Sequence, residues 1–164
     1  MDEDSNNQIA GNTDQTVVVQ ESVFDSGKEI EKLQVESARV GAVVSFIGVM
    51  REFNQGSNVQ SMTLEHYPAM TTKSLLKIVE QAKERWGLIR IKVIHRVGEF
   101  RPQDPIVFVG VTSEHRGDAF LACEFIMDYL KTQAPFWKKE NLTGESRWVD
   151  SRQSDEDAAN RWNK

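Results

Sequence analysis

Cysteine is almost absent from this sequence, since Cys123 is the one example among 164 residues. No intramolecular disulfide can form, and no Cys-X-X-Cys metal-binding pattern is present. The sequence also lacks any apolar run close to the ~20 residues that a membrane-spanning helix needs. Its first residues, MDEDSNNQIAGNTDQ, have neither the basic nor the apolar region of a signal peptide. We therefore expect a soluble, cytoplasmic protein without a membrane partner.

An excess of positive charge is missing too, because 20 Lys and Arg residues face 25 Asp and Glu residues, for a formal net charge of −5. This balance argues against a nucleic-acid partner. The motifs of P-loops, dinucleotide-binding folds, zinc proteases and serine hydrolases do not occur, and the three histidines show no metal-ligand spacing. We predict neither a metal site nor a bound cofactor. Cys123 falls on the apolar face of a predicted helix, as a small buried hydrophobe would.

The chain length suits one domain with a substantial core. Residues 1–15 are acidic and polar and are predicted to form a disordered tail, which leaves a single domain over residues 16–164. Apolar residues at helical spacing predict helices over 26–38, 71–86 and 114–133. Apolar runs and alternating patterns predict strands over 16–20, 41–50, 59–67, 89–97 and 105–113.

From Gly41 onward the predicted order is ββαββα, which indicates an α+β domain with a mostly antiparallel sheet and helices on one face. The strands 41–50 and 105–113 are almost wholly apolar, which is typical of buried strands. The segments REFNQGSN and GEFRPQD are predicted to be loops or turns. After Pro135 the chain is predicted to be irregular. A last short helix is expected over 154–162, with Ser154 as its cap.

What the sequence does have is a set of cations at the ends of predicted buried elements. Arg51 follows the first apolar strand, and His115 and Arg116 lie where a strand meets the N-terminus of a long helix, a favourable place for an anion. Each of these residues taken alone has a plainer interpretation, as a solvated charge, a helix cap or one half of a surface ion pair. Their shared charge and placement favour an anion-binding site.

The stretch KTQAPFWKK, residues 131–139, sets lysines on both sides of an apolar segment. Such an arrangement is expected of a pocket wall with charged groups at its rim. Lys131 and Arg116 lie 15 residues apart on one predicted helix, or about 22 Å at ~1.5 Å per residue. A small ligand cannot touch both residues of the same helix. Either they serve two sites, or a two-fold dimer joins them in one composite site.

At this point the sequence resembles the catalytic (large) subunit family of molybdopterin synthase, over roughly residues 41–162. The segments that carry the resemblance are GAVVSFIGVMR (41–51), LEHYPAM (64–70), VIHRVGE (93–99), VFVGVTSEHR (107–116), FIMDYLKTQAPFWKKE (125–140) and RWVD (147–150). The resemblance implies an α/β hammerhead-type fold with a small additional subdomain. It also implies a homodimer at the core of a heterotetramer, with a small ubiquitin-like sulfur-carrier subunit at each end.

The implied activity is that of a sulfurtransferase in molybdenum cofactor biosynthesis. Two sulfurs pass from the thiocarboxylated Gly-Gly C-terminus of the small subunit to cyclic pyranopterin monophosphate, and the product is molybdopterin. The family's substrate-binding positions fall on Val49, Met50, Arg51, His115, Arg116, Lys131, Lys138, Lys139 and Glu140, and its catalytic positions on Lys131 and Lys138. Some relatives carry lysine where this chain has Val49, so any role there is expected to use the backbone.

Substrate and sulfur donor are both anions, so the implied site is cationic. Arg51, with His115 and Arg116 of a second subunit, is expected to hold phosphate and pterin. Lys131 is expected to stabilise the oxyanion of acyl transfer. Lys138 is expected to move protons, with its pKa depressed by Phe136 and Trp137. The opposite division between the two lysines fits the sequence equally well. Two other functions stay open: a non-catalytic docking module for a ubiquitin-like tail, and an enzyme acting on a different phosphorylated substrate.

Overall fold

The computed structural model describes residues 15–164, so the predicted tail lies outside the described part apart from Gln15. The elements, in chain order, are β1 (Val17–Gln20), α1 (Ser26–Gln34), β2 (Ala42–Val49), β3 (Phe53–Asn54), β4 (Ser57–His66), α2 (Pro68–Arg85), β5 (Leu88–Arg96), β6 (Gly98–Phe100), β7 (Pro105–Ser113), α3 (Arg116–Gln133), β8 (Phe136–Leu142), β9 (Glu145–Val149) and α4 (Gln153–Asn160), with a 3-10 turn at Arg161–Asn163. The predicted α+β class is confirmed. No helix in this described part is long and apolar enough to cross a membrane.

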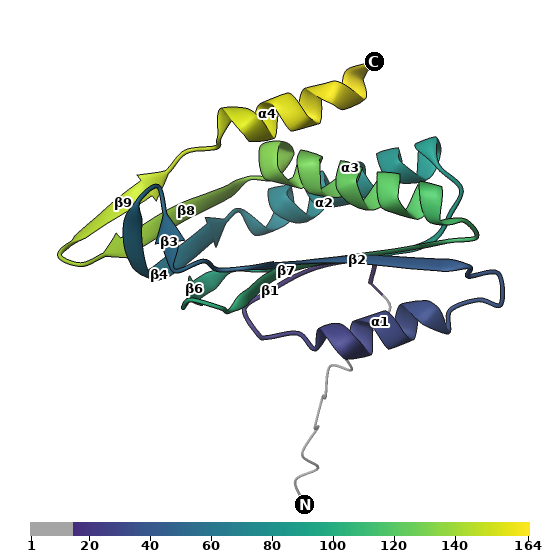
Figure 1. Cartoon of the computed structure of the whole chain (residues 1–164), viewed down its shortest axis with the longest axis horizontal. Helices are drawn as coiled ribbons and strands as arrows, with labels where there is room; N and C mark the ends of the chain where they lie inside the picture. Colours follow the sequence, from purple (N-terminus) through teal and green to yellow (C-terminus); the bar gives the residue numbers. More distant parts are fainter. Residues whose placement is uncertain (1–14) are drawn as a thin grey trace, which may run out of the picture.

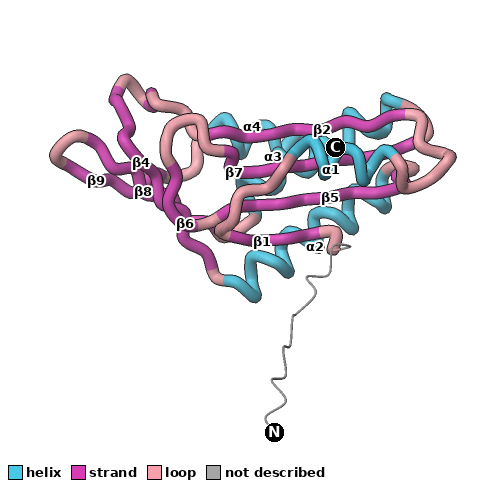
Figure 2. The backbone as a smooth tube through the Cα atoms, turned by 90° about the horizontal axis from the view of Figure 1, so that it is seen from below, coloured by secondary structure: helices cyan, strands magenta, loops and turns pink. Residues whose placement is uncertain are grey.

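Two sheets organise the molecule (Figure 1). The first has the strand order β1-β5-β7-β2, with a parallel β1–β5 pair and antiparallel pairs elsewhere. The second joins β3, β4, β8 and β9 in that order, and β6 also pairs with β4. Seen from below in Figure 2, the second sheet lies at one end of the first, beyond the helical layers. Most strand pairs are antiparallel, as predicted.

Helices cover both faces of the first sheet: the two helices of the predicted ββαββα unit share one face, as expected, and the helix that precedes Gly41 covers the other. Helices α2 and α3 lie on one face and α1 lies on the other (Figure 1). The physical reason is that β7 is apolar on both faces: Val109 packs beneath α2 and α3, whereas Phe108 packs with Leu33 of α1. Gly110 makes room for α1, because a Cβ there would lie 2.3 Å from a Leu33 methyl carbon. A strand buried on both faces needs a helix on each.

Strand β2 was expected to be fully buried, and it is not. It is an edge strand that pairs with β7 within the described residues, and Phe46, Ile47 and Val49 are 41%, 39% and 52% exposed. Packing within one chain therefore does not account for the whole apolar run GAVVSFIGVM. A long apolar edge strand is a surface on which another chain can pair.

The chain after Pro135 is not irregular, as the sequence had suggested, but forms the β8–β9 hairpin. Strand β8 pairs with β4 along its length, and Lys138 lies opposite Leu64 while Glu140 lies opposite Met62. Met62, Leu64 and Glu140 are all buried. The strand escaped detection because charged residues occupy inward-facing positions, which removes the apolar alternation on which strand prediction rests.

Several predicted boundaries shift for local reasons. Helix α2 begins at Pro68, three residues before the predicted start, because proline is well tolerated in the first helical turn. Helix α4 begins at Gln153 with Arg152 at its N-cap position, so Ser154 is not the cap. The two segments expected to be loops contain the short strands β3 and β6.

The C-terminal segment is fastened onto α3 by aromatic side chains. Trp162 meets Trp86 and Phe125 edge to face, with ring centroids 5.7 and 5.5 Å apart. Its indole N–H also donates to Asp128 of α3 at 2.7 Å. These contacts fix α4 over α3 (Figure 1) and so hold the start of α4 beside the C-terminal end of α3.

Candidate active site

The candidate site forms where the last turn of α3 meets the second sheet. Lys131 lies on that last turn, and Lys138 lies on β8 just after it. Arg51 follows the end of β2, and Arg152 stands at the N-cap of α4. These four residues, called the cation cluster below, come from four different elements. Each of the other three acts electrostatically on Lys131, so the fold has gathered charges that are up to 101 residues apart in the chain, from 51 to 152.

The surroundings of Lys131 lower its pKa below the usual lysine value. The largest cause is burial, which disfavours the charged ammonium; Asp155 acts in the opposite direction, and the cations Lys138, Arg152 and Arg51 lower the pKa further. The Lys131 side chain as a whole keeps an exposed surface. The pKa nevertheless follows the surroundings of the ammonium, because the charged end of the side chain is the part that titrates. A lysine of lowered pKa is suited to proton transfer near neutral pH.

A neutral histidine lies close to this lysine. His95 is buried on β5, and its ring stacks on Phe136 with centroids 3.8 Å apart and planes 17° from parallel. Burial lowers the pKa of His95 to about 4; a hydrogen bond with the Arg96 carbonyl opposes this, and the charges of Lys131 and His66 add to it. The neutral Nδ1–H donates to that carbonyl at 2.8 Å. His95 thus contributes an apolar ring, rather than another charge, to the wall of the site.

Glu140 is the anionic centre of a hydrogen-bond network behind the cation cluster. Its side chain is 1% exposed, yet its Oε1 forms an ion pair with Lys138 at 3.2 Å, and Arg147 donates to its Oε2 at 3.1 and 3.0 Å. Asn54 donates to Oε1, and Asn54 in turn accepts from Arg152. Burial raises the pKa of Glu140, but the hydrogen bonds from Asn54 and Arg147 and the charge of Lys138 outweigh it, so the pKa ends below the usual range.

Two residues of the predicted site face away from the cluster. Successive residues of β8 point to opposite faces, so Lys139 lies on the side opposite Lys138, with its ammonium 5.7 Å from the ring centroid of Trp148. Met50 is buried in the core of the second sheet, with its backbone bonded to Asp104 and Gln103. Its side chain is therefore shielded from a ligand.

The apolar pair expected to surround Lys138 is divided between the two faces of β8. Phe136 points to the same face as Lys138 and stacks on His95. Trp137 points to the other face and meets Tyr67 edge to face, with centroids 4.8 Å apart. Desolvation of Lys138 by Trp137 is therefore excluded by the strand geometry.

His115 and Arg116 lie at the opposite end of α3 from Lys131, as their spacing predicted. They border an open hollow of about 450 Å³, together with Gly41, Glu114 and Gly117. Gly41 packs so closely that a Cβ there would lie 2.2 Å from the Glu114 carbonyl oxygen. One chain thus brings Arg51, Lys131 and Lys138 together and leaves His115 and Arg116 about 22 Å away along the helix.

Sequence reasoning missed five residues in or around the cluster. Arg147 and His95 were included in the segments RWVD and VIHRVGE, but without a role. The other three, Asn54, Arg152 and Asp155, have no local pattern that marks them. Their contacts join residues 86 and 98 positions apart, as in the Asn54–Glu140 and Asn54–Arg152 pairs, and such pairs become visible only in the fold.

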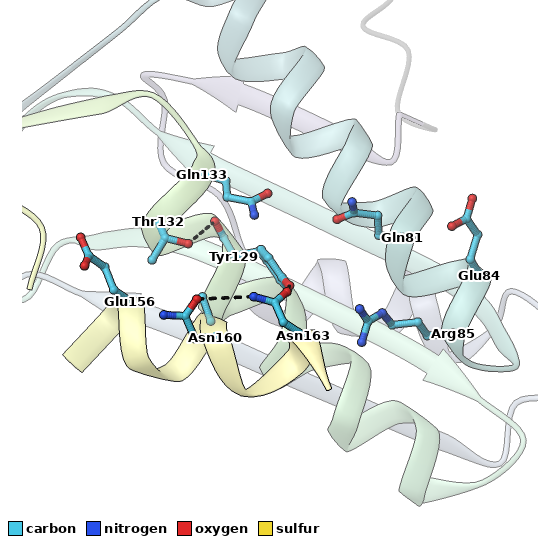
Figure 3. Close-up of a pocket in the computed structure, with 10 residues that line it drawn as sticks. Gln81, Glu84, Arg85, Tyr129, Thr132, Gln133, Glu156, Asn160 and Asn163 are labelled. Carbon is cyan, nitrogen blue, oxygen red and sulfur yellow. Dashed lines mark hydrogen bonds between the residues drawn. The ribbon is translucent and has the colours of Figure 1, made fainter. Parts of the chain in front are cut away.

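A sizeable cavity lies elsewhere, between α2, α3 and α4 (Figure 3). It has a volume of about 580 Å³, and it is lined by Gln81, Glu84, Arg85, Tyr129, Thr132, Gln133, Glu156, Ala159, Asn160 and Asn163. Its lining mixes acids, amides and one arginine, and Arg85 already donates to the Trp162 carbonyl at 3.0 Å. It includes no member of the cation cluster, so volume alone does not identify the site.

The remaining reactive groups offer no competing chemistry. Cys123 is buried, as predicted, and burial raises the pKa of its thiol to about 11, with Glu124 adding to the effect. A thiol of this kind is a poor nucleophile. Within residues 15–164, no group of three or more His, Cys, Asp or Glu side chains is placed to hold a metal ion.

Fold and charge arrangement together define an α+β protein in which cations gather around a lysine of lowered pKa, an arrangement suited to anionic groups. Comparisons with known proteins agree with this class. The sequence model of the family described as MoaE protein matches residues 19–133. The molybdopterin synthase catalytic subunit of Ralstonia nicotianae is 58% identical over 147 residues, which cover 90% of this chain and 84% of that protein.

Solved structures point to the same family. The molybdopterin biosynthesis MoaE protein from Burkholderia ambifaria is 45% identical, with a TM-score of 0.78 and coverage of 91% of this chain and 98% of that one. The complex of subunits 1 and 2 of the molybdopterin-converting factor from Helicobacter pylori contains a chain with a TM-score of 0.71 at 20% identity, covering 84% of this chain and 92% of that one, a likeness of fold. The chain belongs to the MoaE family, that of the molybdopterin synthase catalytic subunits, and is an enzyme of molybdenum cofactor biosynthesis.

Proposed function

We propose that this chain transfers sulfur from the C-terminal thiocarboxylate of a small ubiquitin-like subunit to cyclic pyranopterin monophosphate, and so forms molybdopterin. The observation that carries the proposal is the cation cluster, in which Arg51, Lys131, Lys138 and Arg152 converge from separate elements. The thiocarboxylate and the cyclic phosphate are both anions, and guanidinium groups match phosphate oxygens well. Family membership supports the same reaction.

The geometry favours a definite division of labour between the two lysines. Lys131 has the lowered pKa and is suited to accept and donate protons during acyl transfer. Lys138 forms an ion pair with the buried Glu140 and is thereby held as a fixed positive charge, which suits the stabilisation of a developing oxyanion. We therefore propose the reverse of the first assignment from sequence.

The second half of the site is proposed to come from another copy of the chain. His115 and Arg116 lie too far from Lys131 within one chain, whereas a dimer can bring the hollow beside Arg116 against the cluster of its neighbour. The exposed apolar edge of β2, with Phe46, Ile47 and Val49, is the surface that supports such pairing.

The small subunit is proposed to bind each end of this dimer, so that the full assembly is a heterotetramer. The Helicobacter pylori structure is described as a complex of two molybdopterin-converting factor subunits, which supports a two-subunit enzyme. The extended C-terminus of the small subunit would reach Lys131 and Lys138 from outside the dimer.

The test is reconstitution of the reaction. Purified protein is mixed with a thiocarboxylated small subunit and cyclic pyranopterin monophosphate, and molybdopterin is measured. Product that depends on the thiocarboxylate supports the proposal. A folded protein that binds the small subunit but forms no product would leave the docking-module function instead, and turnover of another phosphorylated substrate without any thiocarboxylate would indicate a different enzyme.

A further inference from the structure

Asn54 is a buried amide at the back of the site, and no part of the proposed reaction yet uses it. Its side chain is 5% exposed. It ends β3, and the hairpin to β4 turns through Gln55 and Gly56, which have φ values of 51° and 76°. Two successive positive φ angles are the mark of a type I′ hairpin turn, which fixes the strand register tightly. The backbone therefore holds Asn54 in one orientation.

Both ends of the Asn54 amide contact ionised groups. The Nδ2 group donates to Glu140 Oε1, and Oδ1 accepts from the Arg152 guanidinium. The backbone carbonyl of the same residue accepts from Arg147 at 3.3 Å. A carboxylate only accepts hydrogen bonds and a guanidinium only donates them, so a bridging side chain must present a donor on one side and an acceptor on the other. The carboxamide of asparagine satisfies both.

These contacts connect Lys138 and Arg152, two members of the cation cluster that share no other partner in this network of described side chains. Glu140 forms the ion pair with Lys138, and Arg152 lies at the start of α4. The path Lys138–Glu140–Asn54–Arg152 joins β8, β3 and the N-cap of α4 through side chains alone. Any shift of Asn54 is therefore transmitted to a lysine and to an arginine of the cation cluster.

We propose that Asn54 is a positioning residue that sets the spacing between Lys138, through Glu140, and Arg152, and thereby matches the pocket to a ligand with two anionic groups. The inference rests on the proposed sulfur transfer, in which thiocarboxylate and phosphate occupy the pocket together. Asn54 itself does not touch the substrate. Misplacement of catalytic groups by about 1 Å can slow a reaction ~100-fold, so loss of this bridge is expected to be visible in turnover.

Two substitutions separate the two links. Asn54→Asp keeps an acceptor for Arg152 but sets a second carboxylate against Glu140, so only the Lys138 side of the bridge is broken. We expect kcat to fall ~10- to 100-fold, while the KM for the pterin substrate stays within about twofold of wild type. Asn54→Leu keeps a similar volume and breaks both links, and both parameters should worsen. Asn58→Asp is the matched control, because Asn58 is exposed on the same hairpin.

The pH profile of Asn54→Asp distinguishes positioning from general damage. Two carboxyl groups in contact share a proton as pH falls, and the shared proton restores a donor between them. The ratio of variant to wild-type kcat should therefore rise as the pH is lowered from 8 to 6. A variant that is merely less stable would gain nothing at lower pH.

A second measurement does not depend on sulfur transfer. The pKa of Glu140 is followed by NMR of the ¹³C-labelled carboxyl group in wild type, Asn54→Asp, Asn54→Leu and Asn58→Asp. We expect the pKa to rise in both Asn54 variants and to stay unchanged in the control. If Asn54→Leu does not fold, the titration of Glu140 in Asn54→Asp alone decides the outcome.

An unchanged Glu140 pKa in the folded Asn54 variants would overturn the bridge itself. A raised pKa with wild-type kcat, KM and pH profile would overturn the positioning role. If wild type and Asn58→Asp make no molybdopterin at all, the proposed function fails, and the Glu140 titration still decides whether the bridge exists.

Discussion

The two ends of helix α3 both carry cations of the proposed site, but they hold them differently. At the C-terminal end, Lys131 is crowded by protein and lies within the field of Arg51, Lys138 and Arg152. At the N-terminal end, Arg116 borders an open hollow of about 450 Å³. The first end gathers several charges within one chain, whereas the second is open to solvent.

This difference supports the proposal that chemistry and recognition are placed on separate parts of the chain. The crowded end lowers a lysine pKa and anchors an ion pair, both of which require a rigid low-dielectric surrounding. The open end can offer a helix N-terminus and a guanidinium to a phosphate with little preorganisation. A symmetric dimer would bring the crowded end of α3 in one chain against the open end of α3 in the other.

The largest expected effect comes from the crowded end. Lys131→Ala removes the proposed proton-transfer group, and we expect kcat to fall ~10²- to 10⁴-fold, the usual range for loss of a general acid–base catalyst. Single-turnover formation of molybdopterin measures this. Lys77→Ala, an exposed lysine on α2, is the control for loss of one positive charge and should keep wild-type kcat. Equal rates for the two variants would contradict the role of Lys131.

Glu140→Gln tests the network that organises the crowded end. The substitution keeps the shape but leaves Lys138 and Arg147 without their carboxylate, so we expect a loss of about 1–3 kcal/mol in the free energy of unfolding together with a clear fall in kcat. Urea denaturation and steady-state kinetics measure the two effects. A variant as stable as wild type would show that the network is not a structural part of the pocket.

Arg116→Ala tests the open end, where the expected effect is on binding. Loss of one guanidinium–phosphate contact should raise the KM for the pterin substrate ~10-fold and leave kcat at saturation within a few fold. The same substitution should not alter thermal stability, since Arg116 is exposed. A fall in kcat with unchanged KM would place Arg116 in the chemical step instead.

The last expected effect concerns stability rather than turnover, and it arises near the crowded end. The folded pKa of His95 is about 4, below its ordinary 6.5, so the unfolded chain takes up the proton first as pH falls. Stability is thus complete above pH 6.5 and declines between 6.5 and 4, by up to about 3 kcal/mol. The lowered pKa of Glu140 acts in the same direction, but only below its ordinary value of 4.5.

His95→Gln should therefore flatten the dependence of unfolding free energy on pH between 6.5 and 4.5. Urea titrations at several pH values measure the slope. An unchanged slope would mean that the pKa of His95 is the same in the folded and the unfolded chain.

The sequence predicted well those elements whose residues share one local pattern. Strand β7 matched its prediction over 105–113, because both its faces are apolar, and the long helix α3 matched to within two residues. The sequence also pointed to Arg51, Lys131 and Lys138 as candidate site residues, since each lies near the end of a predicted buried element. The position of Arg116 far from Lys131 followed from helix geometry.

Prediction failed where the partners of a residue lie far away in the chain. Strand β8 was missed because Lys138 and Glu140 face inward, and the groups that satisfy Glu140 there come from β3 and β9. Arg152 was missed because its function depends on the packing of α4 over α3, which the Trp162 contacts secure. The exposed edge of β2 was taken for core, since an apolar strand has the same sequence whether it packs within a chain or between chains.

The most direct test of the account is complementation between two impaired variants, assayed at a pterin concentration far below the KM of the Arg116 variant, where neither variant alone gives substantial product. Arg116→Ala,His115→Ala chains and Lys131→Ala chains are denatured, mixed in equal amounts, refolded and assayed with thiocarboxylated small subunit. If each site combines Lys131 of one chain with Arg116 of another, random mixing makes half of the dimers hybrid, and one of the two sites in each hybrid is intact, so roughly a quarter of wild-type activity should return. No recovery, with hybrid dimers shown to be present, would contradict the composite site.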